Sequence, residues 1–298
     1  MSTADTIGQF WRAWRDRLNR QGIVTATLDA KLLLAHALGV DSLTLAVREN
    51  EQVSADAMLR ANVLFERRVS GESVARIIGQ KGFYGLDFEL GPATLEPRPE
   101  TELLVDLALA ALPEGGRVLD LGTGTGCIPI ALLVNRPDAT AMATDVSAEA
   151  LEVARRNAER LAVAERLNFA KGDWFDALDA TSDGPKFDLV LSNPPYIASA
   201  IIRTLSTEVR SFDPLLALDG GPDGLTPYRA IAAQAGCFLK RGGAVMVEIG
   251  YDQGEQVSAL FERAHFVNIS VRKDLAGLDR VVVAHHIGEN HSALLSQD

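Results

Sequence analysis

The hydrophobic pattern of the chain changes at Gly79. Before it, apolar residues recur at every third and fourth position, which predicts a small domain of four or five helices. Directly after it, apolar and polar positions alternate around glycines, a pattern typical of a β-hairpin. Further on, short apolar runs alternate with helical segments. The sequence therefore predicts four parts: a helical domain at 1–78, a hairpin linker at 79–96, an α/β domain at 97–286 and a disordered tail at 287–298.

The α/β domain contains apolar runs of the kind that form buried strands. Their alternation with helices predicts a mainly parallel sheet that is covered on both faces. A stretch rich in Pro, Asp and Gly at 199–224 fits neither pattern and predicts a long irregular insertion. The expected strands are 117–121, 139–144, 167–171, 187–192, 244–249, 267–272 and 280–285, and the expected helices are 127–135, 148–161, 226–240 and 253–264.

The strand that begins at Phe187 must end at Asn193. Pro194 and Pro195 follow it, and they lack the backbone N–H that further strand pairing requires. The Asn193 carboxamide and the Tyr196 ring are therefore expected at the carboxyl end of a buried strand, where open α/β sheets bind ligands. The Asn193 side-chain oxygen and the Pro194 carbonyl can both accept hydrogen bonds, which suits a substrate with an NH2 group. For Asn-Pro alone, a simple turn is the alternative.

A glycine-rich loop follows the first predicted strand of the domain. Glycines at alternate positions let a ligand approach the backbone, and a helix N-terminus follows the loop. Asp145 ends the next strand, nineteen residues after the loop, where a carboxylate can bind two ribose hydroxyls. Asp173 follows a third strand and can accept from an exocyclic amine, and Trp174 or Phe175 can flank a purine ring; a core aromatic residue in a turn is the alternative. The loop reads Gly122-Thr123-Gly124-Thr125-Gly126.

Two cofactors compete for this arrangement. A dinucleotide requires the spacing Gly-x-Gly-x-x-Gly, whereas the loop has Gly-x-Gly-x-Gly, and no residue group for hydride transfer is apparent. S-adenosylmethionine requires a loop for its methionine portion, an acid for its ribose and an edge for its adenine. All three are present, and the corner at Asn193 offers a place for the group that is methylated.

Composition and charge narrow the classes of partner. The 298 residues contain no apolar run near the ~20 residues of a membrane span, and the N-terminus lacks a secretory pattern, so we expect a cytoplasmic protein without membrane contact. Cys127 and Cys237 lack metal-ligand spacing, and we expect no metal. The first 78 residues carry ten basic and nine acidic residues, the remainder nineteen and thirty-one, so the larger domain is unsuited to nucleic acid. The basic cluster of Arg12, Arg15, Arg17 and Arg20 is interpreted as the solvated face of an amphipathic helix.

The motifs resemble those of known enzymes. The glycine loop with Asp120 and Asp145 is similar to the cofactor site of the Rossmann-like methyltransferases, and the Asn193 corner is similar to the motif of their amino-methylating branch. Nearly the whole chain is similar to the peptide chain release factor glutamine methyltransferases. Only Glu96 departs, since the family usually has an aliphatic residue there. The additional similar segments are 82–86, 97–103, 172–174 and 274–280.

The resemblance implies a fold, a reaction and a site. The fold is a Rossmann-like class I methyltransferase sheet with a small N-terminal helical domain, joined by a β-hairpin. The reaction moves a methyl group from S-adenosylmethionine, leaving S-adenosylhomocysteine, to the side-chain nitrogen of the glutamine in the Gly-Gly-Gln motif of a release factor. We expect a monomer whose first domain docks the release factor. An adenine-N6 methyltransferase acting on nucleic acid is the alternative.

The resemblance also assigns roles to residues. Cofactor contacts fall to the glycine loop, Asp145, Asp173, Trp174 and Asn193, and substrate contacts to Arg98 and the four residues of the corner. The residues expected to be catalytic are Asn193, Pro194 and Tyr196.

Overall fold

The computed structural model describes residues 6–178 and 186–288, which divide into two compact units. The helical unit comprises the chain through Gln80 together with residues 206–212. The sheet unit comprises residues 81–205 and the chain from Asp213 onward. Of the predicted tail, all but residues 287 and 288 lies outside the described residues. None of the described helices combines the length and the apolar character of a membrane span.

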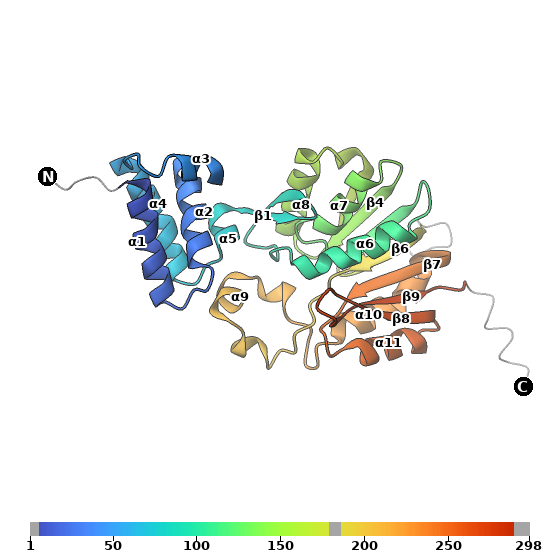
Figure 1. The fold of residues 1–298 in the computed structure, drawn as a ribbon. Helices are drawn as coiled ribbons and strands as arrows, with labels where there is room; N and C mark the ends of the chain where they lie inside the picture. Colours follow the sequence, from blue (N-terminus) through green and yellow to red (C-terminus); the bar gives the residue numbers. More distant parts are fainter. Residues whose placement is uncertain (1–5, 179–185, 289–298) are drawn as a thin grey trace, which may run out of the picture. The chain divides into compact units, whose positions relative to one another are not determined.

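The helical unit is built around aromatic side chains. The Trp14 ring stacks on the Phe65 ring with centroids 4.6 Å apart, and the Trp14 indole nitrogen donates to Asn62 at 3.1 Å. Helices α1, α2 and α4 lie side by side around this core (Figure 1). Short polar residues begin the helices: the Ser54 hydroxyl accepts from the Ala57 amide at the start of α4. The helices are α1 (Ile7–Arg20), α2 (Ala26–Leu38), α3 (Ser42–Val47), α4 (Ala55–Val69), α5 (Val74–Ile78) and α9 (Thr207–Phe212).

The arginines of α1 lie on a solvated face, as predicted. Their side chains are exposed or partly exposed, and three of the four form ion pairs within the helical unit. Charges that are paired with carboxylates add little to the affinity for a phosphate backbone. The pairs are Arg12 with Glu49, Arg15 with Asp16 and Arg17 with Glu66.

Helix α9 corrects the prediction of an irregular insertion at 199–224. This segment contains α9 and the short helices η3 (Ile202–Thr204) and η4 (Leu215–Ala217). Such helices are too short to show a hydrophobic period, which explains the wrong prediction. In the helical unit, the buried Arg68 guanidinium donates to Asp29 at 2.7 Å and to Glu208 of α9 at 3.3 Å.

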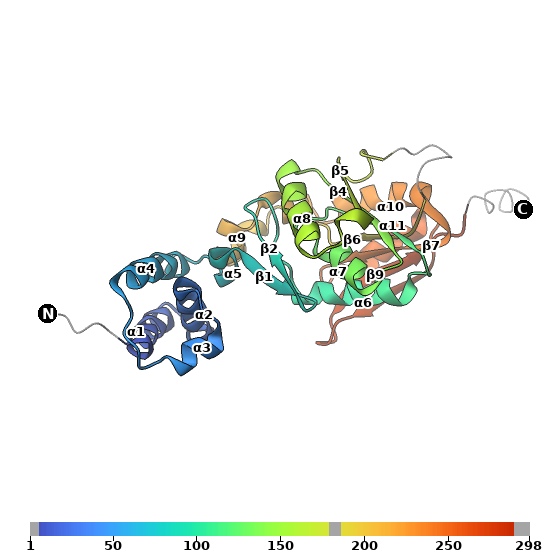
Figure 2. The same ribbon diagram turned by 90° about the horizontal axis from the view of Figure 1, so that it is seen from above.

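The sheet unit contains a mixed seven-stranded sheet in the order β5-β4-β3-β6-β7-β9-β8, with the first five strands parallel. A separate hairpin, β1 (Gln80–Phe83) with β2 (Leu86–Glu89), precedes it and lies beside α8 (Figure 2). The strands are β3 (Arg117–Leu121), β4 (Thr140–Asp145), β5 (Leu167–Lys171), β6 (Phe187–Ser192), β7 (Leu239–Glu248), β8 (Val267–Lys273) and β9 (Asp279–His285). The predicted α/β sheet is confirmed.

Both faces of the sheet are covered, so successive residues of its strands pack into different cores. Val118 of β3 packs with α6, α7 and the hairpin, whereas Leu119 packs with α10 and α11 on the opposite face. Figure 1 shows these two layers of helices above and below the strands. The helices are η1 (Pro99–Thr101), α6 (Glu102–Ala111), α7 (Cys127–Asn135), α8 (Ala148–Arg160), η2 (Ala164–Arg166), α10 (Thr226–Phe238) and α11 (Gly254–Arg263).

One strand boundary differs from the prediction by more than one residue. The helix expected to reach residue 240 ends at Phe238, and β7 begins at Leu239 rather than at Ala244. Gly242 has a positive φ of 80°, and the pairing of β7 with β6 shifts register between Phe187 and Leu189. The irregularity lets the strand begin before the apolar run that marks it in the sequence.

The order of the strands decides where a ligand can bind. From β3 the chain continues to β4 and β5 on one side, whereas β6 and β7 pair on the other side. A crevice opens at such a reversal, outside the carboxyl ends of the strands. The glycine loop follows β3 and Asn193 follows β6, so these two neighbouring strands carry both predicted halves of the site to one edge.

Candidate active site

A cavity of about 700 Å³ lies at this edge of the sheet unit. Most of the predicted site residues line it, and they come from the ends of four strands and from the segment before α6. The structure thus brings the two predicted halves of the site into one space. The predicted residues that line it are Arg98, Gly122, Thr123, Gly124, Thr125, Asp145, Asp173, Trp174, Asn193 and Pro195.

Three predicted site residues do not line this cavity. A side-chain carbon at Gly126 would lie 2.9 Å from Ile130 and 3.2 Å from Ala154, so this glycine serves close packing of α7 on α8. Pro194 is buried. Tyr196 is partly buried against the core, and its backbone carbonyl accepts from the Gln253 side chain at 3.1 Å. The spacing of glycines in the sequence does not separate those that face a ligand from those that face a helix.

The amides of the glycine loop are largely engaged within the protein. Those of Gly122 and Thr123 donate to the Thr144 carbonyl, that of Gly126 donates to the Thr123 carbonyl, and that of Gly124 donates to the Asp145 carboxylate at 2.9 Å. A pyrophosphate is bound through amides that are free to donate to it. The loop therefore favours a cofactor without phosphates, which agrees with the preference for S-adenosylmethionine over a dinucleotide.

The walls beside the loop carry an acid and an aromatic ring. Asp145 is partly buried, and burial raises the pKa of its carboxyl, while hydrogen bonds from the amides of Ser147 and Gly124 oppose the rise. The Trp174 ring lies close to Gly122, since a side-chain carbon built there would be 3.7 Å from it. Trp174 has a positive φ of 50°, a strained conformation for an aromatic residue. Phe175 is buried and stacks on Phe238, so it belongs to the core.

Asp120, near the end of β3, has no hydrogen-bond partner among the described residues. It is fully buried, and neither carboxylate oxygen has a hydrogen bond within the part of the chain that the structure describes. The nearby Thr123 hydroxyl is likewise buried without a partner there. Burial raises the pKa of Asp120 to about 7, and the negative charge of Asp145 adds to this rise. A buried carboxylate in this condition can be stabilised by a cation.

Asn193 is held by a chain of hydrogen bonds. Its side-chain nitrogen donates to the Thr101 hydroxyl at 3.0 Å, and that hydroxyl donates to the Glu248 carboxylate at 2.6 Å. Thr101 and Glu248 are both buried. Burial raises the pKa of Glu248 to about 7, and the hydrogen bond from Thr101 opposes the rise. The sequence gives little indication of a role for either residue. Thr101 follows the turn at Pro97-Arg98-Pro99, where a polar residue is expected to be structural. Glu248 is marked only as an acid near the end of a predicted apolar strand.

Arg98 lines the cavity but is already paired. Its guanidinium donates to the buried Asp213 carboxylate at 2.7 Å. This pair ties the turn before α6 to the segment that follows α9. Glu96, the departure from the family pattern, is buried and forms an ion pair with Lys81 at 2.9 Å. The pairing explains how a carboxylate is accommodated at this position.

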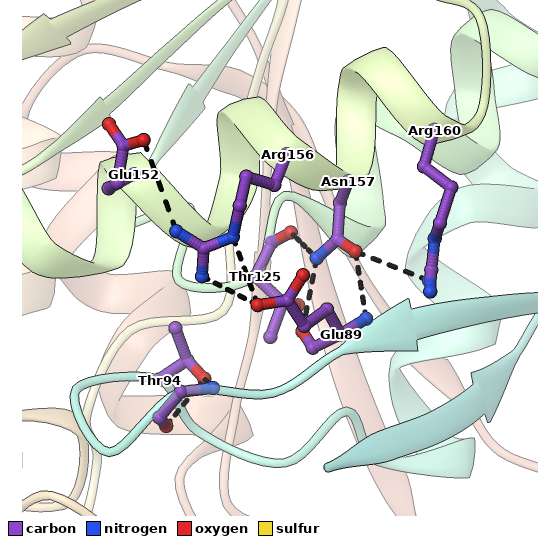
Figure 3. A network of polar contacts seen from close by, with 8 residues as sticks. Glu89, Thr94, Thr125, Glu152, Arg156, Asn157 and Arg160 are labelled. Atoms are coloured by element: carbon purple, nitrogen blue, oxygen red, sulfur yellow. Dashed lines mark hydrogen bonds and ion pairs between the residues drawn. The ribbon is translucent and has the colours of Figure 1, made fainter.

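A polar network anchors the glycine loop from behind (Figure 3). The buried Asn157 side chain of α8 donates to the Thr125 carbonyl at 3.0 Å and to the Glu89 carbonyl at 3.1 Å, and it accepts from the Glu89 amide at 2.8 Å. Arg156 forms an ion pair with the Glu89 carboxylate at 2.6 Å. One side chain thereby fixes the loop to the end of the hairpin, whose continuation through residues 93 and 95 lines the cavity.

Family models match both parts of the chain. The PrmC N-terminal domain matches residues 9–79, and the methyltransferase small domain matches residues 99–208. A release factor glutamine methyltransferase of Agrobacterium fabrum is 45% identical over 276 residues, 91% of this chain and 94% of its own. One of Caulobacter vibrioides is 44% identical, over 93% of this chain and 96% of its own. The chain belongs to the release factor glutamine methyltransferase family.

The structural comparison agrees with this family on the fold. A methyltransferase from Pyrococcus furiosus shares 20% identity with a TM-score of 0.52, over 78% of this chain and 98% of its own. At that identity the likeness concerns the fold alone. Together with the matching family models, it confirms the predicted class I methyltransferase fold with a helical N-terminal part.

Proposed function

We propose that this enzyme transfers a methyl group from S-adenosylmethionine to the side-chain amide nitrogen of the glutamine in the Gly-Gly-Gln motif of peptide chain release factors. The observation that carries the proposal is that Asn193 and Pro195 line the same cavity as the glycine loop and Asp145. A family of matching relatives supports the substrate. A protein that acts on translation factors belongs in the cytoplasm, which we propose as its location.

The residues of the cavity suit the proposed cofactor. S-adenosylmethionine carries an ammonium group and a sulfonium. The carboxylate of Asp120 does not line the cavity, but it lies just before the glycine loop and has no hydrogen-bond partner among the described residues, so it can stabilise positive charge there. We assign the ribose hydroxyls to Asp145 and the adenine to the Trp174 ring. No atom of the described residues would lie within 4 Å of a side-chain carbon at Gly124, so a ligand can approach the backbone there.

The residues at Asn193 suit a planar NH2 group. With its own nitrogen turned to Thr101, the Asn193 side chain has its oxygen left to accept from the substrate amide. We propose the Pro194 carbonyl as the second acceptor for the other N–H, although Pro194 is buried and does not line the cavity in the free protein. Two fixed acceptors prevent the amide from rotating, and alignment of this kind can contribute on the order of 7 kcal/mol or more to catalysis.

Methyl transfer to an amide nitrogen depends more on alignment of the amide with the methyl group than on a general base. Bound S-adenosylmethionine supplies a methyl group on a positively charged sulfur. The amide nitrogen is a weak nucleophile because its lone pair is delocalised. The acceptors must therefore hold the amide while that lone pair forms the new N–C bond, as the S–CH3 bond breaks and its electron pair stays on sulfur. Oxygen atoms at Asn193 and Pro194 stabilise the positive charge that develops on nitrogen. One of the two amide protons then leaves to water.

Methyl transfer with tritium-labelled S-adenosylmethionine tests the proposal. Purified release factor, the same factor with its Gly-Gly-Gln glutamine replaced by alanine, DNA and RNA are offered in parallel. We expect label on the intact release factor alone. Label on the alanine factor would refute the glutamine as the acceptor. Label on DNA or RNA would favour the alternative, an adenine-N6 methyltransferase; the ion pairs of the α1 arginines disfavour that result.

A further inference from the structure

The Thr101 hydroxyl determines which group donates in each of the two hydrogen bonds that join Asn193, Thr101 and Glu248. A hydroxyl has a single proton, and when the Glu248 carboxyl 2.6 Å away is ionised, that proton is committed to the carboxylate. Only oxygen lone pairs of Thr101 then face Asn193, 3.0 Å away. The NH2 side of the carboxamide can donate to those lone pairs, whereas its oxygen would be repelled by them.

Three distant parts of the chain build this arrangement. Asn193 follows β6, Thr101 ends the short helix η1, and Glu248 ends β7, the strand that pairs with β6. Thr101 is 2% exposed and Glu248 is 1% exposed, so water does not compete for these hydrogen bonds. Among the described residues, Thr101 is the one hydrogen-bond donor to the Glu248 carboxylate.

Burial of the Glu248 carboxylate lowers the stability of the fold. A buried carboxylate with one donor loses more hydration than one hydrogen bond returns, and burial raises its pKa accordingly. The positive charges of Arg280 and Arg98 oppose that rise, and the negative charge of Glu100 adds to it. The Tyr228 hydroxyl donates at 2.8 Å to the Glu248 backbone carbonyl, not to its carboxylate. A residue that weakens the fold in this way is better explained by what it orients than by stability.

We propose that Thr101 and Glu248 are positioning residues that hold the Asn193 carboxamide with its oxygen toward the substrate nitrogen; this inference rests on the proposed function. Glu248 holds the Thr101 proton, and the Thr101 oxygen then accepts from the Asn193 side-chain nitrogen. The Asn193 side-chain oxygen is thereby turned toward the substrate. The site then offers acceptors only, so it takes a glutamine amide and repels a carboxylate of the same shape. Without the Thr101 hydroxyl the carboxamide can turn over, and its NH2 group would face the substrate instead.

The decisive variant is Thr101→Val, which removes the hydroxyl and keeps the shape of the side chain. Thr101→Ser is the matched control, because it keeps the hydroxyl. We expect Thr101→Val to lower kcat on release factor about 100-fold, because a misplacement of the reacting group by about 1 Å can lower the rate by about that factor. The KM for release factor and the Kd for S-adenosylhomocysteine should change less than about threefold, and Thr101→Ser should stay within about threefold of the wild type.

A competition experiment separates orientation from general damage. The competitor is a release factor in which the Gly-Gly-Gln glutamine is replaced by glutamate. The wild-type enzyme should bind it poorly, because its carboxylate meets acceptors only. In Thr101→Val the turned carboxamide can donate to that carboxylate, so inhibition by the competitor should strengthen at least about fivefold while turnover of the glutamine substrate falls. A merely structural loss would weaken both.

Glu248→Met tests the remaining link. If Glu248 acts through Thr101, the Glu248→Met variant loses activity and the double variant with Thr101→Val is no worse than Thr101→Val alone. Binding of S-adenosylhomocysteine reports folding, and Thr101→Ala replaces any Thr101→Val protein that fails to bind it.

The outcomes keep this proposal apart from the proposed function. No label on any release factor by the wild type would refute the function itself. An active wild type with a fully active Thr101→Val would overturn the positioning role alone. Equal losses in Thr101→Val and Thr101→Ser, or additive losses in the double variant, would overturn it as well.

Discussion

Two buried carboxylates at the same edge of the sheet differ in what surrounds them. Asp120 in β3 has no hydrogen-bond partner among the described residues, whereas Glu248 in β7 accepts from Thr101 at 2.6 Å. Burial raises both pKa values to about 7. The contrast is consistent with the proposed function, in which a cofactor would supply the missing partner of Asp120, whereas Thr101 and Glu248 already order Asn193 in the free protein.

The largest effect is expected from removing the ordered acceptor. Asn193→Ala should lower kcat about 1000-fold, or about 4 kcal/mol, because the substrate amide loses both its alignment and an oxygen that stabilises developing charge. The Kd for S-adenosylhomocysteine should stay within about threefold. Single-turnover kinetics and calorimetry measure the two. Comparable losses in both would contradict the separation between the two sides of the cavity.

The pH dependence of stability tests both carboxylates together. Their folded-state pKa values lie above the unfolded ones, so the stability they contribute is full below about pH 4 and is lost as the pH rises through about 7. The complete shift corresponds to about 4 kcal/mol for Asp120 and about 3 kcal/mol for Glu248. Urea unfolding between pH 5 and 8 should show declining stability in the wild type.

The matched variants for this experiment are Asp120→Asn and Glu248→Gln, which keep the shapes and remove the charges. Each should flatten part of the decline. The exposed carboxylate of Asp223 does not interfere in this window, because hydrogen bonds from Arg229 lower its pKa to about 2. Equal stability of the wild-type protein at pH 5 and pH 8 would be incompatible with two carboxylates of this kind.

Asp120→Asn should also weaken the binding of the cofactor. If the unpartnered carboxylate stabilises the positive charge of S-adenosylmethionine, its loss should raise the Kd about 30-fold, or about 2 kcal/mol, as for a hydrogen bond to a charged group. At pH 8 the same variant should be more stable than the wild type when no cofactor is bound. Calorimetric titration and urea unfolding check the pair of effects. A variant that is less stable and binds the cofactor normally would make Asp120 a structural residue.

The smallest effect is expected at the anchor of the glycine loop. Asn157→Ala removes the hydrogen bonds that join Thr125 to the hairpin, and we expect it to lower cofactor affinity about fivefold, or about 1 kcal/mol. Glu152→Gln on the exposed side of the same helix is the control and should bind like the wild type. Binding of S-adenosylhomocysteine measures both. An unchanged affinity in Asn157→Ala would show that the loop holds its shape without the anchor.

Local patterns predicted much of the fold and part of the site. The apolar run before Pro194 marks both the end of β6 and the place of Asn193, because proline cannot continue a strand. The same local logic finds the glycine loop between β3 and α7 and the acid at Asp145. These features depend on a few consecutive residues, which is why they can be read without the structure.

What the sequence does not reveal depends on distant residues that meet. Thr101 and Glu248 are 147 positions apart, and their contact requires η1 to lie at the carboxyl end of β7. Gly126 looks like its neighbours in the loop but packs against Ala154 of α8. The partner of a side chain is decided by packing between elements, and no local period records it.

The inclusion of residues 206–212 in the helical unit matters for anyone who divides this protein. Because α9 comes from the middle of the chain, the backbone passes between the units at three places rather than one. Expression of residues 1–80 alone would leave Arg68 without Glu208, one of its two carboxylate partners. A chimaera that exchanges the helical unit between relatives therefore has to exchange residues 206–212 with it.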